Sequence, residues 1–313
     1  MKVASFYRFL DLEDAGAFRE QLQSQCDDRR LLGTVLVANE GFNGSLSGDE
    51  RAIREVFAWI EEFLGLGEAI EARWNDIDEA PFRRMRVRPK KEIVALGRPD
   101  ILPHRGTGKY VSGDEWNDLI ANPDVIVIDT RNHYEYEVGT FPNAVDPHTD
   151  SFREFPEFAE KLAETSKDRP VAMFCTGGIR CEKATALMLE LGFEEVYHLQ
   201  GGVLKYLEDM PPDKNRWDGE CFVFDTRVAV DRDLAEGGYV QCHACRRPLS
   251  TEDIASPDYR EGVSCPKCIN ELDDDRAARL EERAKQVELA RERGDTHIGP
   301  QKSSSGPEGV QQK

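Results

Sequence analysis

The pattern of apolar and polar residues divides the chain into segments with different periodicities. In residues 1–97, apolar runs of strand length flank two amphipathic segments, and the second segment places Ile53, Phe57 and Ile60 on one helical stripe. Two further strand-like runs meet around residues 39–44, where turn-forming residues crowd together. The order strand, helix, strand, strand, helix, strand predicts a ferredoxin-like α+β domain.

A different alternation follows in residues 122–212. Short apolar runs lie between helical segments, which predicts a parallel sheet with helices on both faces. Residues 98–121, which begin with a Gly- and Pro-rich loop, are expected to connect the two domains. Ligands of such sheets bind at the carboxyl ends of the strands, and Arg131 and Cys175 both lie at predicted strand ends.

The composition changes again after residue 212. Residues 213–270 hold one strand-like run and two closely spaced pairs of cysteines, so they are expected to form a small Cys-rich module. Residues 271–293 have the pattern of a charged helix with a narrow apolar stripe. Residues 294–313 contain almost no apolar residues, which predicts a disordered tail. The predicted fold is therefore a multidomain α/β protein.

The most informative motif places Cys175 after an apolar strand and directly before a helix. Gly177 and Gly178 let the backbone curl so that amides face the sulfur, and the helix adds its positive end. Such surroundings lower the pKa of a thiol and make it a nucleophile at neutral pH. Arg180 is expected to add a fixed positive charge at the rim of the loop. The alternative is a buried structural cysteine, and Cys181 is either a resolving thiol or a small helix residue.

Four other cysteines have the spacing of a zinc site, because two C-x2-C pairs are separated by nineteen residues. Four thiolates would close the coordination sphere, which predicts a structural role for the metal. The alternatives are metal-free thiols or two local disulfides. The expected ligands are Cys242, Cys245, Cys265 and Cys268.

Charge is distributed unevenly along the chain. The formal net charge of −19 argues against general coating of a nucleic acid. Residues 83–91, however, hold six basic and no acidic residues, and strand periodicity puts alternate cations on one face. This basic strip could attract an anionic partner, or it is a solvated strand with a chance cluster. Its members are Arg84, Arg86, Arg88 and Lys90.

Several classes of protein are not indicated. No apolar run approaches the length of a membrane span, and acidic residues come too early for a secretory signal, so a cytoplasmic protein is expected. The sequence suggests no flavin, haem or 2-His-1-carboxylate iron pattern, and hence no organic cofactor. His133 and His148 are each expected to be structural or solvated.

Several motifs in the middle of the chain resemble those of rhodanese domains. These domains have a D-x-R strand end, a G-x4-A segment and an active-site cysteine that opens a six-residue loop. The matching residues are Asp129, Arg131, Gly139, Ala144 and Cys175. Arg180 gives the spacing C-x4-R, one residue shorter than in tyrosine phosphatases, so a phosphatase is the weaker alternative.

A wider resemblance covers roughly residues 1–270. The segments NEGFNGSLSG, GTGKYVSGDEWN and CTGGIRCEKA, followed by the Cys-rich segment, resemble the rhodanese-like tRNA uridine-34 hydroxylases. The resemblance implies oxygen-dependent formation of 5-hydroxyuridine at the wobble position, with molecular oxygen as co-substrate and the tRNA anticodon loop as partner. It also implies a central role for Cys175, supported by Arg180. The N-terminal unit of that family is called acylphosphatase-like, but the phosphate-binding loop of an acylphosphatase is not evident here.

Two other functions stay open. A sulfurtransferase would carry a persulfide on Cys175, and a non-enzymatic protein would use the same domains as a scaffold for RNA or protein. If the partner is tRNA, the expected phosphate contacts are cations of the basic strip, a strand-end arginine and three cations beside the cysteine pairs. These residues are Arg84, Arg86, Arg88, Lys90, Arg131, Arg246, Arg247 and Lys267.

Overall fold

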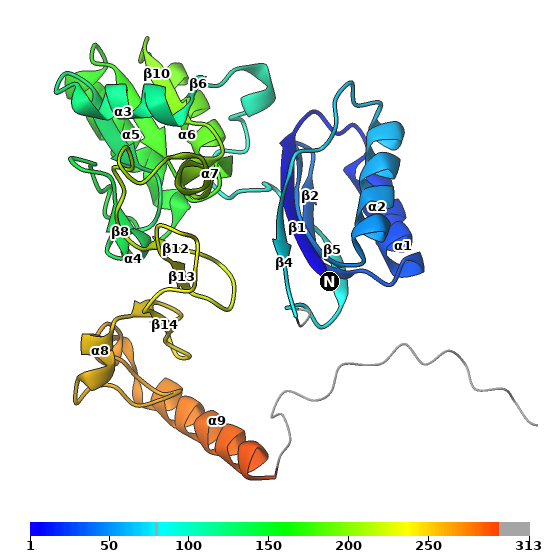
Figure 1. Cartoon of the computed structure of the whole chain (residues 1–313), viewed down its shortest axis with the longest axis vertical. Coiled ribbons are helices and arrows are strands. Elements are labelled where there is room, and N and C mark those ends of the chain that lie inside the picture. The colour runs from blue at the N-terminus through cyan, green and yellow to red at the C-terminus, as the bar shows by residue number, and fades with distance from the viewer. Residues whose placement is uncertain (79–80, 294–313) are drawn as a thin grey trace, which may run out of the picture.

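A computed structural model describes residues 1–78 and 81–293, which form three parts (Figure 1). An N-terminal α+β domain lies beside a central domain with a parallel sheet. A small Cys-rich module and a long helix follow below the central domain. The predicted disordered tail, residues 294–313, lies outside the described residues.

The N-terminal domain contains the predicted ferredoxin-like arrangement, with one strand added. Its sheet has the order β4-β1-β3-β2-β5, and β5 runs parallel to β2 at the edge. The strands are β1 (Lys2–Phe9), β2 (Leu32–Ala38), β3 (Gly41–Gly48), β4 (Ala72–Asp76) and β5 (Met85–Pro89). The helices are α1 (Ala15–Asp28) and α2 (Glu50–Leu64), and both cover the same face of the sheet (Figure 1).

Helix α2 shows how the local sequence sets its own limits. The Asp49 side chain accepts a hydrogen bond from the Ala52 amide at the start of the helix, and Gly65 ends it in the left-handed conformation with φ of 61°. The stripe predicted from the sequence, which includes Ile53 and Ile60, is buried against the sheet. The opposite face of this sheet is turned toward the central domain (Figure 1).

The central domain contains the predicted parallel sheet with helices on both faces. The strand order is β6-β10-β9-β7, and every neighbouring pair is parallel. The strands are β6 (Lys109–Val111), β7 (Ile126–Asp129), β9 (Val171–Phe174) and β10 (Val196–Leu199). The helices are α3 (Gly113–Ala121), α4 (His133–Tyr136), α5 (Phe155–Ser166), α6 (Ile179–Glu190) and α7 (Gly202–Asp209), with short 3-10 turns at Pro103–Arg105 and Phe152–Glu154.

Alternate residues of each central strand enter different cores. Val127, Ala172 and Phe174 pack with α3 and α7, whereas Ile128 and Met173 pack with α5 and α6. Both faces of the sheet are therefore covered, as expected for uninterrupted apolar strands.

The boundaries of the central domain extend beyond residues 122–212. Residues 98–121 are more than a connector, because β6 joins the sheet and Trp116 of α3 is fully buried in the core. Residues 213–230 also pack onto this domain, since Trp217 is fully buried beside Phe174. In this segment β11 (Asp218–Gly219) pairs with β8 (Gly139–Thr140), and β12 (Cys221–Phe222) pairs with β13 (Ala229–Val230). The Cys-rich module proper therefore begins after residue 230.

The C-terminal module is small and has little apolar core. It consists of β14 (Val240–Gln241), β15 (Pro248–Leu249), α8 (Thr251–Ala255) and a 3-10 turn at Ile269–Glu271. Helix α9 (Asp274–Glu292) follows where a charged helix was predicted, and it buries no residue. Within residues 1–78 and 81–293, no helix is long and apolar enough to cross a membrane.

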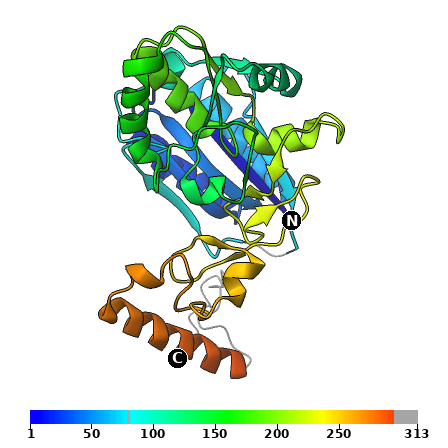
Figure 2. The same cartoon turned by 90° about the vertical axis from the view of Figure 1, so that its left-hand side faces the viewer.

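The N-terminal and central domains are joined by a buried ion-pair cluster. Lys183 of α6 is fully buried, and its Nζ lies 2.6 Å from Glu40 Oε2 and 2.7 Å from Glu92 Oε2. Glu40 belongs to the turn between β2 and β3, and its other oxygen accepts a hydrogen bond from the Ile93 amide. The view in Figure 2 places the central domain in front of the N-terminal sheet. The NEGFNG turn thus holds the two domains together.

Candidate functional site

Cys175 lies where the sequence predicted it, at the carboxyl end of β9 and before α6. The thiol is only 1% exposed. Gly178 precedes the helix with φ of 94°, a conformation that disfavours residues with a Cβ atom. Its amide donates a hydrogen bond to Cys175 Sγ over 3.1 Å. The loop therefore turns backbone N–H groups toward the sulfur, as predicted.

The loop favours the thiolate form of Cys175. Burial raises the pKa of this thiol, but hydrogen bonds from Cys181, the Arg180 charge and the Gly178 amide outweigh burial and lower the pKa to about 6. Two other buried cysteines lack such donors, and burial raises the pKa of Cys26 and of Cys221 to about 12. Cys175 is therefore set apart by its hydrogen-bond donors and not by its depth.

Cys181 is a hydrogen-bond donor to Cys175. Burial and the neighbouring Cys175 charge raise the pKa of the Cys181 thiol, so this residue keeps its proton while Cys175 loses its own. The Thr130 hydroxyl lies 3.6 Å from Cys181 Sγ and donates to the Phe174 carbonyl. The geometry gives Cys181 a positioning role beyond that of a small helix residue.

Arg180 is buried and paired, whereas the sequence suggested a charge at the rim of the loop. Its guanidinium nitrogens lie 2.6 and 2.8 Å from the two carboxylate oxygens of Glu135 on α4. Burial raises the pKa of Glu135, but the Arg180 charge outweighs burial and keeps that pKa below its usual range. Thr176 completes the group with a 3.3 Å hydrogen bond to Glu135. Glu135 was not identified from the sequence, because its partner lies 45 residues away.

The carbonyl groups of the cysteine loop are held by the start of α7. The amides of Val203 and Leu204 donate to the carbonyls of Cys175 and Thr176 over 2.9 and 3.1 Å. Gly202 allows this approach, since a Cβ atom there would lie 2.5 Å from the Cys175 carbonyl oxygen. This contact explains the second glycine of the QGGVLKY segment and leaves the loop amides free to face the sulfur.

The N-terminal domain also contacts the region of the cysteine loop, through the start of α6. Tyr7 of β1 donates a 2.7 Å hydrogen bond to Glu182 on α6, and Tyr110 donates to the same carboxylate. Burial raises the pKa of Glu182, although the two tyrosine hydrogen bonds oppose that change. Ile179 at the start of α6 packs against a small apolar cluster that includes Phe9 of the N-terminal domain. The candidate site is therefore built from two domains.

One exposed aromatic ring lies near this group. Phe224 is 71% exposed, and Arg180 Cζ lies 5.9 Å from the centre of its ring. Phe222 contacts the same ring edge to face. An exposed ring beside an arginine of the cysteine loop can stack on a planar ligand.

Asp129 and Arg131 stabilise the central domain from within. Both side chains are fully buried, and Arg131 Nη2 lies 2.6 Å from Asp129 Oδ2 and donates to the Gly139 carbonyl. The guanidinium also stacks on Trp217, 4.9 Å from the ring centre. The expectation that Arg131 contacts RNA is wrong, because this side chain is not accessible. Arg131 instead forms a buried ion pair. The sequence pattern alone does not distinguish an arginine in a buried pair from one that contacts a ligand at the surface.

The basic strip follows strand β5, at the edge of the N-terminal sheet, and includes the residue on either side of it. Arg84, Arg86, Arg88 and Lys90 are exposed, whereas Val87 between them is buried. This alternation is the one that the sequence predicted. The strip therefore presents a row of exposed cations on an edge strand, and its contact with RNA stays a prediction.

The four cysteines of the C-terminal module converge on one point. Their Sγ atoms all lie within 4.8 Å of one another, with 3.8 Å between Cys245 and Cys265 and 3.6 Å between Cys265 and Cys268. Ligand atoms about 2.3 Å from a tetrahedral zinc ion lie roughly 3.8 Å apart, whereas a disulfide joins sulfurs about 2.05 Å apart. Cys242, Cys245, Cys265 and Cys268 therefore fit a metal ion and are not disulfides.

Two of the three cations beside the cysteines are engaged with acidic residues. Arg247 forms a 2.6 Å ion pair with Glu271, and Lys267 lies 3.0 Å from Glu137 of the central domain. Arg246 donates to the side chain of Gln241. Lys267 thus docks the module onto the central domain, whereas the Arg247–Glu271 pair lies within the module. Phosphate contacts by either cation would compete with these carboxylates.

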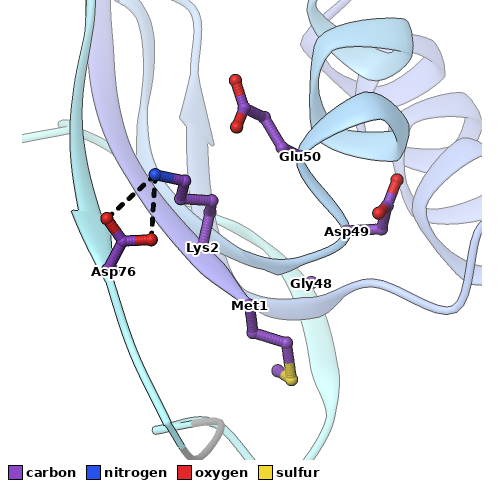
Figure 3. Close-up of a pocket in the computed structure, with 6 residues that line it drawn as sticks. All are labelled: Met1, Lys2, Gly48, Asp49, Glu50 and Asp76. Atoms are coloured by element: carbon purple, nitrogen blue, oxygen red, sulfur yellow. Dashed lines mark hydrogen bonds and ion pairs between the residues drawn. The ribbon is translucent and has the colours of Figure 1, made fainter.

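A separate cavity of about 320 Å³ lies at the other end of the N-terminal sheet (Figure 3). Its lining includes Asp49, Glu50 and Asp76, and Lys2 is already paired with Asp76 over 2.9 Å. Three carboxylates outnumber the one cation, which is already paired, so this cavity does not attract an anion. The chemistry of the protein is expected at Cys175.

A thiolate at the end of a central parallel strand, cradled by a strand-to-helix loop, defines a rhodanese-type domain. Comparison with known families agrees, since residues 112–209 match the rhodanese-like domain. Residues 1–93 match the family described as UPF0176 acylphosphatase like domain. The chain thus combines these two domains, an architecture consistent with the UPF0176 rhodanese-like family.

Similar solved structures cover about one third of the chain. A rhodanese-related protein from Thermoplasma volcanium is 21% identical over 33% of this chain and 95% of its own, with a TM-score of 0.28. A human single-domain sulfurtransferase is 24% identical over 34% of this chain and all of its own, with a TM-score of 0.28. A protein from Rhodopseudomonas palustris described as a possible tyrosine phosphatase is 19% identical over 32% of this chain and 80% of its own, with a TM-score of 0.26.

Proposed function

We propose that this protein hydroxylates uridine 34 of tRNA to 5-hydroxyuridine, with molecular oxygen as co-substrate. The observation that carries the proposal is the stabilised Cys175 thiolate, whose pKa of about 6 leaves it deprotonated at neutral pH. The match to the UPF0176 acylphosphatase-like and rhodanese-like domains, in the order that resembles the tRNA uridine-34 hydroxylases, supports this choice of substrate.

In the proposed reaction, Cys175 attacks C6 of the uracil ring. The new S–C6 bond moves the C5=C6 electron pair toward the C4 carbonyl, so that C5 becomes nucleophilic and accepts oxygen. Loss of the C5 proton and departure of Cys175 then restore the double bond. The net reaction adds one oxygen atom from O2 and releases the other as water, so two electrons and two protons come from an external thiol-type donor.

The surrounding residues have distinct tasks in this scheme. The Gly178 amide and the Cys181 thiol hold the charge on Cys175 before attack and when it departs. Arg180 is held by Glu135, so its charge stays fixed beside the loop. Because Cys175 is only 1% exposed, the uracil has to be turned out of the anticodon loop and to displace a covering side chain. The exposed Phe224 is the proposed stacking partner.

Mass spectrometry of tRNA nucleosides tests this proposal directly. Deletion of the gene is expected to remove 5-hydroxyuridine and its derivatives from tRNA, and the wild-type chain is expected to restore them. Cys175→Ser is expected to abolish restoration while tRNA binding is retained. Cys221→Ser is the matched control, because Cys221 is equally buried but lies outside the loop. Full modification by Cys175→Ser would refute the role of this thiol.

A sulfurtransferase is the second candidate, and the rhodanese-like domain match favours it. In that reaction Cys175 would take the outer sulfur of thiosulfate as a persulfide, releasing sulfite, and pass it to cyanide or a thiol acceptor. The same loop amides would hold the persulfide anion. Thiosulfate:cyanide activity that depends on Cys175, in a strain whose tRNA nucleosides are unchanged by the deletion, would select this function over hydroxylation.

A further inference from the structure

A second cluster of metal-ligand side chains lies outside the cysteine sites. His133 at the start of α4, Asp146 and His148 come from two separate segments, and one ligand atom from each lies within 4.8 Å of the others. The Nδ1 atoms of the two histidines approach the same carboxylate oxygen of Asp146, over 2.6 and 3.1 Å. The sequence indicated no such set of two histidines and a carboxylate, because the segments that carry them are brought together only by the fold. We propose that these three residues bind a divalent transition-metal ion.

The fold holds the three ligands in place before any ion binds. Val145 pairs with Ile128 beside β7, so the Asp146 that follows lies next to that strand, and its side chain is only 6% exposed. The His133 amide donates to the Thr149 carbonyl over 2.8 Å, which ties the start of α4 to the second segment. These backbone contacts fix the relative positions of His133 and Asp146.

His148 is held by a less common backbone conformation. Its φ is 54°, in the left-handed region that residues other than glycine rarely adopt. Its amide donates to Asp146 Oδ1 over 2.8 Å, so one carboxylate oxygen orients the loop while the other faces both imidazoles. Strain of this kind persists where the surroundings enforce it, and it is enriched at ligand sites.

The ligand chemistry selects a class of ion. Two imidazole nitrogens and one carboxylate oxygen suit Mn²⁺, Fe²⁺, Co²⁺, Ni²⁺ or Zn²⁺ better than Mg²⁺ or Ca²⁺, which prefer oxygen. Ligand atoms about 2.1 Å from an ion and at right angles lie roughly 3.0 Å apart, close to the spacings from Asp146 to the two histidines. His133 and His148 are 42% and 74% exposed in their side chains, so the remaining coordination positions would be open to solvent.

An outer carboxylate supports His133. Glu137 Oε1 lies 3.9 Å from the second ring nitrogen of His133, and Glu137 Oε2 lies 3.0 Å from Lys267. Metal-binding histidines commonly direct their other ring nitrogen toward such a carboxylate. Lys267 stands between Cys265 and Cys268, so the proposed site adjoins the point where the C-terminal module contacts the central domain.

Cobalt binding to the full-length chain tests the proposal. The chain is first loaded with one equivalent of zinc, which occupies the four-cysteine site, and is then titrated with Co²⁺. We expect one further equivalent to bind, with weak visible d–d absorption and no intense thiolate-to-cobalt band. A His133→Ala/His148→Ala chain and an Asp146→Asn chain are expected to lose this equivalent and to keep the zinc.

Control variants separate a metal site from a hydrogen-bonded cluster. His104→Ala removes another exposed histidine and is expected to leave cobalt uptake unchanged. Glu137→Gln is expected to weaken cobalt binding about tenfold through the outer carboxylate. Circular dichroism checks that each variant is folded. We expect the histidine variants to fold, because both histidine side chains are substantially exposed. If the wild-type chain takes up no second equivalent, or if the double variant binds as much cobalt as the wild type, the proposal is overturned.

Discussion

Burial and hydrogen bonding act on Cys175 in opposite directions. A thiol that is 1% exposed should resist ionisation, as the buried Cys26 and Cys221 do. The loop reverses this tendency with the Gly178 amide, the Cys181 thiol and the Arg180 charge. The nucleophile therefore depends on three specific groups, and two of them, the Cys181 thiol and the Arg180 charge, can be removed separately by substitution.

The first prediction concerns the pH dependence of Cys175. Its rate of alkylation by a small reagent is expected to rise with a midpoint near pH 6, whereas Cys26 and Cys221 react only far above neutral pH. Mass spectrometry after brief labelling measures each cysteine separately. Cys181→Ala is expected to shift the midpoint upward, because a donor is lost. An unchanged midpoint in that variant would contradict the positioning role of Cys181.

The same pKa change makes a contribution to stability. The pKa of Cys175 is lowered from 9.0 to about 6 in the folded chain, so the unfolded chain binds more protons between these pH values. The free energy of unfolding is therefore expected to rise from pH 6 to pH 9 and to lose this contribution as pH falls through 6. Denaturant titrations at several pH values measure the slope, and Cys175→Ser is expected to reduce it.

Opposite effects are expected from the two partners of the Arg180–Glu135 pair. Arg180→Gln removes a positive charge beside Cys175 and should raise its pKa, whereas Glu135→Gln leaves that charge uncompensated and should lower it. Each change also breaks a buried ion pair and is expected to destabilise the chain by about 3–5 kcal/mol. Alkylation profiles and urea unfolding measure the two effects. A shift in the same direction for both variants would show that the loop had simply loosened.

Only part of this site could be predicted from local sequence. Cys175, Gly178 and Arg180 lie within one short loop, and a strand end followed by a helix start fixes their relation. Glu135 and Tyr7 come from distant segments, and nothing near them distinguishes them from other acids or tyrosines. Their roles arise from packing between elements, which a single sequence does not specify.

At the scale of elements, the buried Lys183 links α6 to the turn between β2 and β3. Burial raises the pKa of Glu40, although Lys183 opposes that change. Lys183→Met would leave Glu40 and Glu92 buried without a cation, and we expect a loss of about 3–5 kcal/mol. Urea unfolding followed by tryptophan fluorescence measures the loss, since both domains contain tryptophans.

Two further variants show whether unpaired charge or lost packing causes that loss of stability. Adding Glu40→Gln and Glu92→Gln to Lys183→Met removes the unpaired charges and is expected to recover part of the lost stability. Lys161→Met breaks the exposed pair with Glu157 and is expected to have no measurable effect. If the triple variant is no more stable than Lys183→Met, lost packing and not unpaired charge explains the change.

Prediction of helices and strands succeeded where a periodic pattern extended over several residues, and it failed at the edges of the domains. The α2 stripe and the alternation on β5 were visible because several residues repeat one pattern. The role of β6 in the sheet was missed because three residues give no period. Trp217 was assigned to the Cys-rich module because two prolines precede it, although its ring completes the central core.

At the scale of the whole molecule, the four cysteines are expected to hold a module that has little core of its own. Removal of the metal by a strong chelator should unfold residues after about 240 and leave the central domain folded, because metal binding supplies folding free energy in small modules. Limited proteolysis with mass spectrometry locates the cuts. Cys245→Ser is expected to give the same pattern without chelator. Cuts throughout residues 213–230 would contradict their packing on the central domain.

The remaining prediction concerns how an acidic chain binds an anionic partner. A net charge of −19 repels RNA over most of the surface, so binding has to rely on a local row of cations such as the strip on β5. Replacement of its four cations by glutamine should reduce the slope of log K against log salt for tRNA by about 3, since each phosphate contact contributes roughly 0.7–0.9. The residues to replace are Arg84, Arg86, Arg88 and Lys90.

A second variant with the same change in net charge distinguishes contact from overall repulsion. Four exposed cations that pair with carboxylates elsewhere serve this purpose: Arg51, Arg54, Lys161 and Arg260. Both variants lower the net charge equally, so a general effect would weaken tRNA binding to the same extent in both. Only a direct contact makes the strip variant lose slope while the control keeps it. The slopes are measured by filter binding from low to physiological salt. Equal slopes for the strip variant and the control variant would show that the strip does not contact RNA.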